Sequence, residues 1–402
     1  MAAPSVAGQH VAANQAAAAR AGAGGAAQGQ QAAVPFPQAS KRAHEQPLTF
    51  TLTPGTSPII LGPSDLTPNG YLRHVDIHVR TVTPGTLGPG TAPDTFPFNI
   101  LQNIQFIDTG GQKMDDLAGY ALMQDNIAGG SPYRADPRIA HDYSASLIEP
   151  NFRLRIAREI FPDGRGALPN LSGSQKYRIR AVIDAIANIY TVAPTTAPTL
   201  AVDVTDHLWL LPAAVDGGGR PQQRRPSLLG LAQYRTSFYP SVAVSSANVD
   251  YQIKATGNLV KYIVMVARNA AGARSDLVFP DPLTLRLDNS YPYDNLSLAD
   301  AIHYSDAMLE ARSARDTGVL ILPFNYGMGL AVGDNGVASW LPTSTATYIE
   351  FKGKQPTPTV GTIDYLVCEI STAEIDPAER SAMGSGTGTW QPAIAANVPG
   401  GV

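Results

Sequence analysis

Three segments in the first half of the chain are followed, in the same order, by three similar segments about 185 residues later. The matching pairs are GYLRHVDIHVR (70–80) with GNLVKYIVMVAR (257–268), FPFNILQNIQFID (96–108) with FPDPLTLRLD (279–288), and MDDLAGYALM (114–123) with NLSLADAIHY (295–304). A repeat of this length is too long for a solenoid unit and has the size of one β-sandwich domain. The order of the segments therefore predicts a duplicated sandwich.

Alternating apolar and polar residues, the pattern of a strand with one buried face, recur along most of the chain. In residues 71–82, for example, Val75, Ile77 and Val79 share one face and polar side chains share the other. Strands are predicted at residues 48–53, 71–82, 99–108, 152–158, 176–190, 200–211, 259–266, 283–288, 318–323, 346–352 and 362–371. Turn clusters rich in Gly and Pro separate them, and strands do not alternate regularly with helices. The predicted fold class is all-β.

One helix is predicted at residues 296–315, where apolar side chains recur on one face. Ser297 and Asp300 fit the capping box that starts such a helix. The segment RAVIDAIANIY (180–190) also has helical periodicity. It is predicted as strand because the residues before it alternate and TVAPTTAP (191–198) ends it.

The ends of the chain differ in composition from the part between them. Residues 1–34 contain 15 Ala, 5 Gln and 5 Gly, and no acidic residue precedes Glu45. Such a segment cannot fold alone, so it is either a disordered tail or an arm that orders against a neighbouring subunit or an anionic surface. The predicted division is an N-terminal arm (1–47), a first sandwich (48–215), a linker (216–226), a second sandwich (227–375) and a C-terminal arm (376–402).

Composition excludes several classes of protein. The net charge of −4 gives no overall basic field, so direct sequence-specific binding of nucleic acid is not expected. The single cysteine, Cys368, excludes an intrachain disulfide framework, a Cys-rich zinc site and an iron–sulfur cluster. The longest apolar runs, at 262–267 and 319–324, are far shorter than the roughly 20 residues of a membrane-spanning helix. The N-terminus also lacks the pattern of a Sec signal.

His74, Asp76 and His78 are candidate metal ligands because they alternate along one predicted strand. Alternate residues on a strand face lie about 7 Å apart, so two neighbours could hold one ion but the outer pair could not. A third ligand would have to come from elsewhere, and the other histidines are scattered in the sequence: His10, His44, His141, His207 and His303. We interpret the three residues as the polar face of a strand and predict no metal site.

The remaining candidates do not form an active site, so the chain is predicted to have no catalytic residue and no cofactor. GAGGAA (22–27) resembles a dinucleotide-binding turn but follows no strand. The adjacent Asp115 and Asp116 are expected to open a helix or a turn. Arg220, Arg224 and Arg225 indicate a solvated loop or a phosphate contact, and Arg153, Arg155 and Arg158 a strand face or an interface. Trp209, Trp340 and Trp390 are too far apart in sequence to indicate a stacking platform, and Trp209 is expected in the core.

Cys368 is predicted to be structural. In DYLVCEI (364–370) the side chains of Leu366, Cys368 and Ile370 share one wholly apolar strand face. That face is expected to be the buried one, where a free cysteine behaves as a small hydrophobic residue.

Several stretches resemble major capsid proteins of tectivirus-like bacteriophages. They are PFNILQNIQFIDTGG (97–111) with LAGYALM (117–123), FRLRIAREIFPDGRGALPN (152–170), and SQKYRIRAVIDAIANIYTVAPTTAPTLAVDV (174–204). The resemblance is densest over residues 97–211 and thinner in the second half. It implies a double jelly roll, meaning two eight-stranded jelly rolls in one chain. It also implies pseudo-hexagonal homotrimers that tile an icosahedral shell of the tectivirus–adenovirus lineage.

The resemblance also implies partners and a location. The partners would be copies of the same chain, minor capsid or vertex proteins, and the lipid of an inner membrane, which the N-terminal arm would face. The location would be the capsid shell of a virion, and the host cytoplasm during assembly. Two alternatives stay open: a carbohydrate- or receptor-binding β-sandwich, such as a spike or lectin-like protein, and a hydrolase on the same kind of fold. An aromatic content of 7% without a Trp or Tyr cluster speaks against the first.

Overall fold

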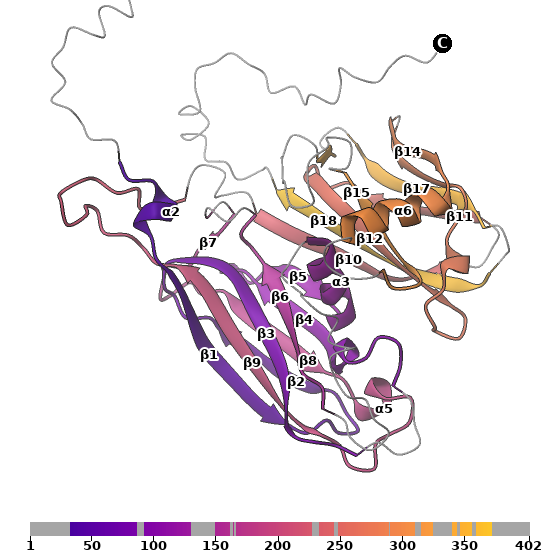
Figure 1. The fold of residues 1–402 in the computed structure, drawn as a ribbon, viewed down its shortest axis with the longest axis horizontal. Helices are drawn as coiled ribbons and strands as arrows, with labels where there is room; N and C mark the ends of the chain where they lie inside the picture. Colours follow the sequence, from indigo (N-terminus) through magenta and orange to yellow (C-terminus); the bar gives the residue numbers. More distant parts are fainter. Residues whose placement is uncertain are drawn as a thin grey trace, which may run out of the picture.

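The structure is a computed structural model, and it contains two β-sandwiches, one formed by each half of the chain (Figure 1). It describes residues 33–86, 92–129, 149–160, 164, 166–226, 233–244, 248–288, 290–309, 315–324, 340–343, 346–355 and 359–371. Within these residues, no helix is long and apolar enough to cross a membrane. The predicted C-terminal arm (376–402), Trp390, His10 and His141 lie outside the described residues.

The first sandwich contains nine strands and most of the helices of the first half. Its strands are β1 (Arg42–Leu52), β2 (Ile59–Asp65), β3 (Tyr71–Thr83), β4 (Leu101–Ile107), β5 (Lys113–Leu117), β6 (Phe152–Ala157), β7 (Leu168–Pro169), β8 (Arg178–Ile183) and β9 (Thr199–Trp209). The helices of this half are α2 (Phe36–Ala39), η1 (Phe98–Ile100), α3 (Gly119–Gly129) and α5 (Ile186–Ile189).

Among the described residues, the second sandwich has the same number of strands and fewer helices. Its strands are β10 (Gln233–Val244), β11 (Asn248–Lys254), β12 (Leu259–Asn269), β13 (Leu283–Leu287), β14 (Ser290–Leu296), β15 (Val319–Pro323), β16 (Leu341–Pro342), β17 (Tyr348–Lys354) and β18 (Gly361–Ser371). Its helices are η3 (Asp276–Val278) and α6 (Leu298–Leu309). Each long helix, α3 or α6, follows the fifth strand of its sandwich.

The strand order is identical in the two sandwiches. The first has sheets β1-β9-β3-β6, with β7 beside β3, and β2-β8-β4-β5. The second has sheets β10-β18-β12-β15, with β16 beside β12, and β11-β17-β13-β14. All the pairings between these strands are antiparallel. Two packed sheets of this order form a jelly roll, so the predicted duplication and all-β class are confirmed.

The duplication extends to the register of the strands. Leu168 of β7 lies opposite Leu72, and Leu341 of β16 lies opposite Val260, which makes Leu72 and Val260 equivalent. A register shift then follows at the same place in each sandwich, between Leu72 and His74 and between Val260 and Tyr262. His74 and Tyr262 therefore occupy equivalent positions.

The first sandwich begins earlier than the sequence pattern indicates. β1 starts at Arg42 rather than at Leu48, and α2 lies within the predicted arm 1–47. Phe36 of α2 is buried, with its ring 5.9 Å from that of Trp209 and 5.3 Å from that of Tyr71. An aromatic cluster between segments far apart in sequence gives no local pattern, which is why this part of the fold was not predictable.

Two predicted elements differ in detail. The strand predicted at 176–190 ends at Ile183, and α5 follows it. The capping box of α6 is present, since the Asp300 amide donates to Ser297 Oγ at 3.1 Å. The described part of α6 ends at Leu309, and Arg315 lies outside any helix.

The sequence pattern does not predict β2, β5, β7, β10, β11, β14 or β16. Three of the longer strands among these, β2, β10 and β14, contain a proline. Pro63 lies within the register shift between Leu61 and Ser64, and Pro240 within the shift between Tyr239 and Val242. A register shift is where a strand tolerates the missing amide of proline. Proline in a sequence lowers the signal for a strand, so these three strands were missed.

Candidate functional site

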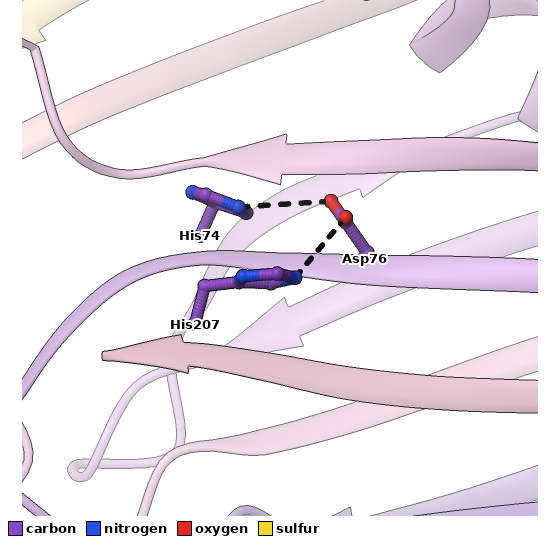
Figure 2. Close-up of side chains that lie close together, drawn as sticks. All are labelled: His74, Asp76 and His207. Atoms are coloured by element: carbon purple, nitrogen blue, oxygen red, sulfur yellow. Dashed lines mark ion pairs between the residues drawn. The ribbon is translucent and has the colours of Figure 1, made fainter. Parts of the chain in front are cut away.

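The structure brings a further residue, His207, to two of the three sequence candidates, His74 and Asp76. His207 of β9 lies directly opposite His74 of β3, and the two rings stack with their centroids 4.2 Å apart (Figure 2). His207 Nε2 lies 3.2 Å from Asp76 Oδ2, and His74 Nε2 lies 4.0 Å from Asp76 Oδ1. The sequence pattern could not predict this contact, because His207 is far from Asp76 in sequence and only the pairing of β9 with β3 brings the two together. His78 is not part of the group, because its Nε2 lies 2.7 Å from Asn151 Oδ1.

Electrostatics fix the charge states of this His–Asp–His cluster. Burial, reinforced by the positive charge of Arg155, lowers the pKa of His74 to about 2, so His74 is neutral. Burial alone would raise the pKa of Asp76. Hydrogen bonds from His207 and Arg155, together with the charge of Arg155, outweigh burial and hold that pKa well below its usual range. Asp76 is thus a buried carboxylate.

The cluster has donor atoms suited to a transition metal, since one atom from each residue lies within 4.8 Å of the others. The Asp76 carboxylate already accepts two hydrogen bonds from Arg155, one from Nε to Oδ1 at 2.9 Å and one from Nη2 to Oδ2 at 3.2 Å. Arg153 adds a second guanidinium, 3.9 Å from Oδ2. A metal ion would have to share Asp76 with two positive charges, which opposes binding. The absence of a metal site stays a prediction.

The cluster belongs to a larger polar surface, the outer face of the β1-β9-β3-β6 sheet, which we call the outer sheet face. We define it by Asp76, Arg80, Arg153, Arg155, Asp203 and His207. Arg80 Nε donates to Asp203 Oδ2 at 2.8 Å, and the Arg153 side chain is 58% exposed. The predicted role of Arg153 and Arg155 on a strand face is confirmed.

A buried carboxyl lies on the opposite side of the same sheet. Asp206 lies opposite Val75, pointing into the sandwich, and is fully buried. Burial, with a further contribution from the nearby charge of Glu45, raises the pKa of Asp206 to about 7. Asp206 therefore titrates near neutral pH.

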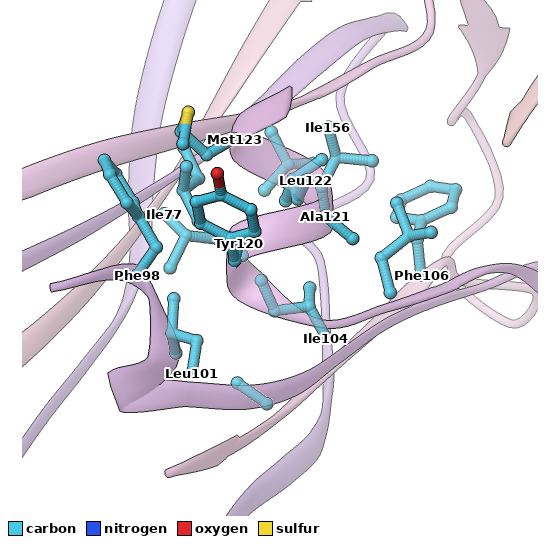
Figure 3. Close-up of a cluster of buried hydrophobic side chains, with 14 of the residues drawn as sticks. Ile77, Phe98, Leu101, Ile104, Phe106, Tyr120, Ala121, Leu122, Met123 and Ile156 are labelled. Atoms are coloured by element: carbon cyan, nitrogen blue, oxygen red, sulfur yellow. The ribbon is translucent and has the colours of Figure 1, made fainter. Parts of the chain in front are cut away.

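α3 forms the junction between the two sandwiches (Figure 1). On one side its residues pack into the first core, where Figure 3 shows Tyr120, Leu122 and Met123 among other buried side chains. On the other side, Asp125 accepts hydrogen bonds from Tyr262 Oη at 2.9 Å and Thr236 Oγ1 at 3.2 Å. Burial raises the pKa of Asp125 to about 6, although these two hydrogen bonds act in the opposite direction.

Ion pairs extend the junction on both sides of α3. Arg158 is buried and pairs with Asp115, and the Thr236 amide donates to Asp115 Oδ1 at 3.3 Å. Arg274 of the second half pairs with Asp94 at 2.9 Å and with Asp316 at 2.7 Å. The prediction that Asp115 opens a helix or turn is wrong, because Asp115 lies in β5. Its neighbour Asp116 points to the other face of that strand, toward Lys113.

Cys368 is buried, as predicted, but both faces of its strand are buried. Leu366, Cys368 and Ile370 face the first sandwich and belong to the large cluster that includes α3. Tyr365 and Val367 face the core of the second sandwich. The face that the sequence indicated as core is therefore the junction face, because the β10-β18-β12-β15 sheet is covered on both sides.

Within the part of the chain that the structure describes, the other sequence candidates do not assemble into a site. Arg220 is exposed, Arg224 Nε donates to the Pro212 carbonyl at 3.3 Å, and Trp209 and Trp340 are both buried. A polar groove of about 650 Å³ lies between the sandwiches. It is lined by Asp108, Gln112, Lys113, Met114, Arg235, Tyr239, Lys254, Ala255, Thr256 and Asn258. Among the described residues that line this groove, Tyr239 is the one aromatic side chain.

Comparison with known proteins bears on the fold. No protein-family model matches the chain, and no curated protein matches it. The chain is similar to the crystal structure of the STIV MCP, with 14% sequence identity, a TM-score of 0.58 and coverage of 85% of this chain and 99% of that chain. It is also similar to the atomic structure of Sulfolobus Turreted Icosahedral Virus, with 15% identity, a TM-score of 0.60 and coverage of 85% and 96%. This likeness, together with the strand order, shows the double jelly-roll fold.

Proposed function

We propose that the chain is a viral major capsid protein that forms homotrimers with a pseudo-hexagonal outline, which tile an icosahedral shell. The observation that carries this proposal is the repetition of one jelly roll in the same strand order and register. Two equivalent units in one chain allow three chains to present six similar units around an axis. The likeness to the STIV MCP and to the structure of a turreted icosahedral virus supports the same function.

The role is structural rather than enzymatic. In the His–Asp–His cluster, the carboxylate of Asp76 is held by Arg155 and His74 is buried and neutral, which does not suit acid–base catalysis. A shell protein needs a rigid body whose strand edges are protected, and two closed double-sheet rolls supply it. The lining of the polar groove gives no support to the carbohydrate-binding alternative.

The finer parts of the proposal concern the setting of the shell. The resemblance of residues 97–123 and 152–204 to tectivirus-like capsid proteins supports a bacteriophage virion with an inner membrane. Residues 1–47 carry Arg20, Lys41 and Arg42 against Glu45, a net charge of +2, which suits contact with anionic lipid. We therefore place the N-terminal segment on the inner side, toward the membrane, neighbouring trimers, and minor capsid or vertex proteins.

Expression of the chain and measurement of its mass test this function. A capsid protein is expected to give a stable trimer or larger shells in native mass spectrometry and electron microscopy. A monomer that binds a glycan array would contradict the proposal and support the carbohydrate-binding alternative.

A further inference from the structure

The two long helices sit at the same place in the two sandwiches but have different surroundings. α3 is buried on nearly all sides because the second sandwich covers it. α6 packs against β15 through Ser305 and exposes Ala299, Asp300, His303 and Asp306 on its other side. One helix thus has a neighbouring sheet, and the equivalent helix has an exposed face.

Hydrogen bonds establish which residues of the two helices are equivalent. Asn126 of α3 bonds both the amide and the carbonyl of Arg155, each at 2.7 Å. Ser305 of α6 bonds the amide of Ile321 at 2.8 Å and its carbonyl at 3.1 Å. Arg155 lies opposite Asp76 and Ile321 opposite Val264, at equivalent places in the two sheets. Asn126 therefore corresponds to Ser305, and, six residues earlier in each helix, Tyr120 corresponds to Ala299.

The two equivalent sheets differ in the opposite sense: the outward face is covered in the second sandwich and exposed in the first. Arg268 pairs with Asp364 on the face of the second sandwich that α3 covers, and its guanidinium lies 5.7 Å from the centre of the Tyr120 ring. Arg80 and Asp203 form the equivalent ion pair on the outer sheet face. The Arg268 side chain is 19% exposed, whereas that of Arg80 is 45% exposed.

We infer that the outer sheet face of one chain binds the exposed face of α6 of a second copy, in the arrangement that α3 and the second sandwich adopt within one chain. The inference rests on the proposed trimer and names the surfaces that form it. An exposed helix face and an exposed sheet face on opposite halves of the chain make a head-to-tail contact, which generates a ring when the rotation closes.

The charges on the two surfaces are complementary. The outer sheet face presents the partly exposed guanidinium groups of Arg80 and Arg153. The exposed face of α6 presents the carboxylates of Asp300 and Asp306. Asp306 is 56% exposed, and its Oδ1 also lies 3.8 Å from Arg315 Nε of the same chain. Opposite charges across an interface fix its register and raise the rate of encounter.

The chemistry of the two contacts also fits the stage at which each forms, one on folding of the chain and the other on assembly. The contact within one chain includes an apolar patch, in which Val264, Leu366 and Ile370 pack against the first sandwich. At the positions equivalent to Val264 and Cys368, the outer sheet face has Asp76 and His207. A contact that forms only on assembly leaves its surfaces in water beforehand, where a large apolar patch would cause aggregation.

Chemical cross-linking tests the predicted contact. The variant Arg80→Cys/Ala299→Cys places one thiol on each surface, and Cys368 is buried and so protected from the reagent. Treatment of the trimer with a short bismaleimide is expected to give covalently linked dimers and trimers on denaturing gels. The matched control Lys254→Cys/Ala299→Cys, with an exposed thiol on β11 instead, is expected to stay unlinked.

A second test does not depend on the folding of the double-cysteine variant. Arg153→Glu reverses an exposed charge on the outer sheet face, and Lys254→Glu reverses one elsewhere. Arg153→Glu is expected to weaken association by at least about tenfold, while Lys254→Glu leaves it unchanged. If the wild-type chain is monomeric, the proposed function itself fails. If the wild-type trimer forms, but the Arg80→Cys/Ala299→Cys trimer does not cross-link and Arg153→Glu does not weaken association, the inference is overturned and the proposed function stands.

Discussion

His74 and Tyr262 occupy the same position in the two jelly rolls, one residue beyond the same register shift, yet they meet different surroundings. The Tyr262 hydroxyl donates to Asp125 inside the junction, whereas His74 stacks on His207 beside the carboxylate of Asp76. The same backbone thus carries a junction in one half of the chain and a polar surface in the other. The surface is covered in the second jelly roll and exposed in the first, and this difference is the basis for the proposed ring of three chains.

Tyr262→Phe is expected to destabilise the chain by about 1–3 kcal/mol, because it removes a hydrogen bond from the buried carboxyl of Asp125. Denaturant titration measures the change. Tyr348→Phe, at an exposed position, is the control and is expected to have little effect. Equal stability of Tyr262→Phe and the wild type would show that the junction does not depend on this contact.

Cys368→Ser is expected to cost about 1–3 kcal/mol, since a hydroxyl replaces a thiol in an apolar, fully buried site. The native protein should also react slowly with a thiol reagent and quickly once unfolded. Trimers of the variant should still form. Loss of assembly without loss of stability would instead indicate a chemical role for the thiol.

Stability is expected to fall as the pH rises from about 4 to 8. The pKa of Asp206 is raised to about 7 in the folded chain, against about 3.9 in an unfolded chain, so folding favours the protonated form. That contribution is complete below the unfolded pKa and is lost as the pH passes the folded one, at most about 4 kcal/mol. Asp206→Asn should therefore stabilise the chain at pH 8 and flatten the pH profile.

Unfolding in urea at pH 5 and at pH 8 checks this prediction. The exposed Asp65→Asn serves as the control and should keep the wild-type pH dependence. Asp125, with its pKa raised to about 6, contributes in the same direction, so some dependence should persist in Asp206→Asn. A profile unchanged by Asp206→Asn would contradict the assignment.

Two truncations separate the N-terminal segment from the fold. Deletion of residues 1–32 should leave the melting temperature unchanged, whereas deletion of residues 1–40 should lower it. The longer deletion removes Phe36, whose loss from its aromatic cluster costs about 3–5 kcal/mol by analogy with Phe→Ala changes in cores. The shorter deletion should still impair shell assembly, because we place the segment in contacts with neighbouring trimers. Normal shells from that variant would show that the segment is dispensable.

Local sequence pattern was enough for the fold class and for the duplication, because strand periodicity and the order of segments are carried by neighbouring residues. Val75, Ile77 and Val79 are buried as their alternation predicts, and Ser297 caps α6. Contacts between residues that are far apart in sequence were not predictable. His207 reaches Asp76 only through pairing of β3 with β9.

The orientation of the second sandwich was also beyond local pattern. Leu366, Cys368 and Ile370 form an apolar face whether they meet their own core or a neighbouring sandwich. Only the packing of α3 against β12 and β18 decides between the two. The junction residues Asp125 and Arg274 carry no motif, and their partners Tyr262 and Asp94 lie in the other half of the chain.

Native mass spectrometry of the purified wild-type chain tests the central claim most directly. Three copies of a 42.4 kDa chain in one stable particle, with no populated dimer, is the predicted result. A monomer that persists across protein concentration and ionic strength would contradict the account, since two equivalent jelly rolls would then have no assembly to build.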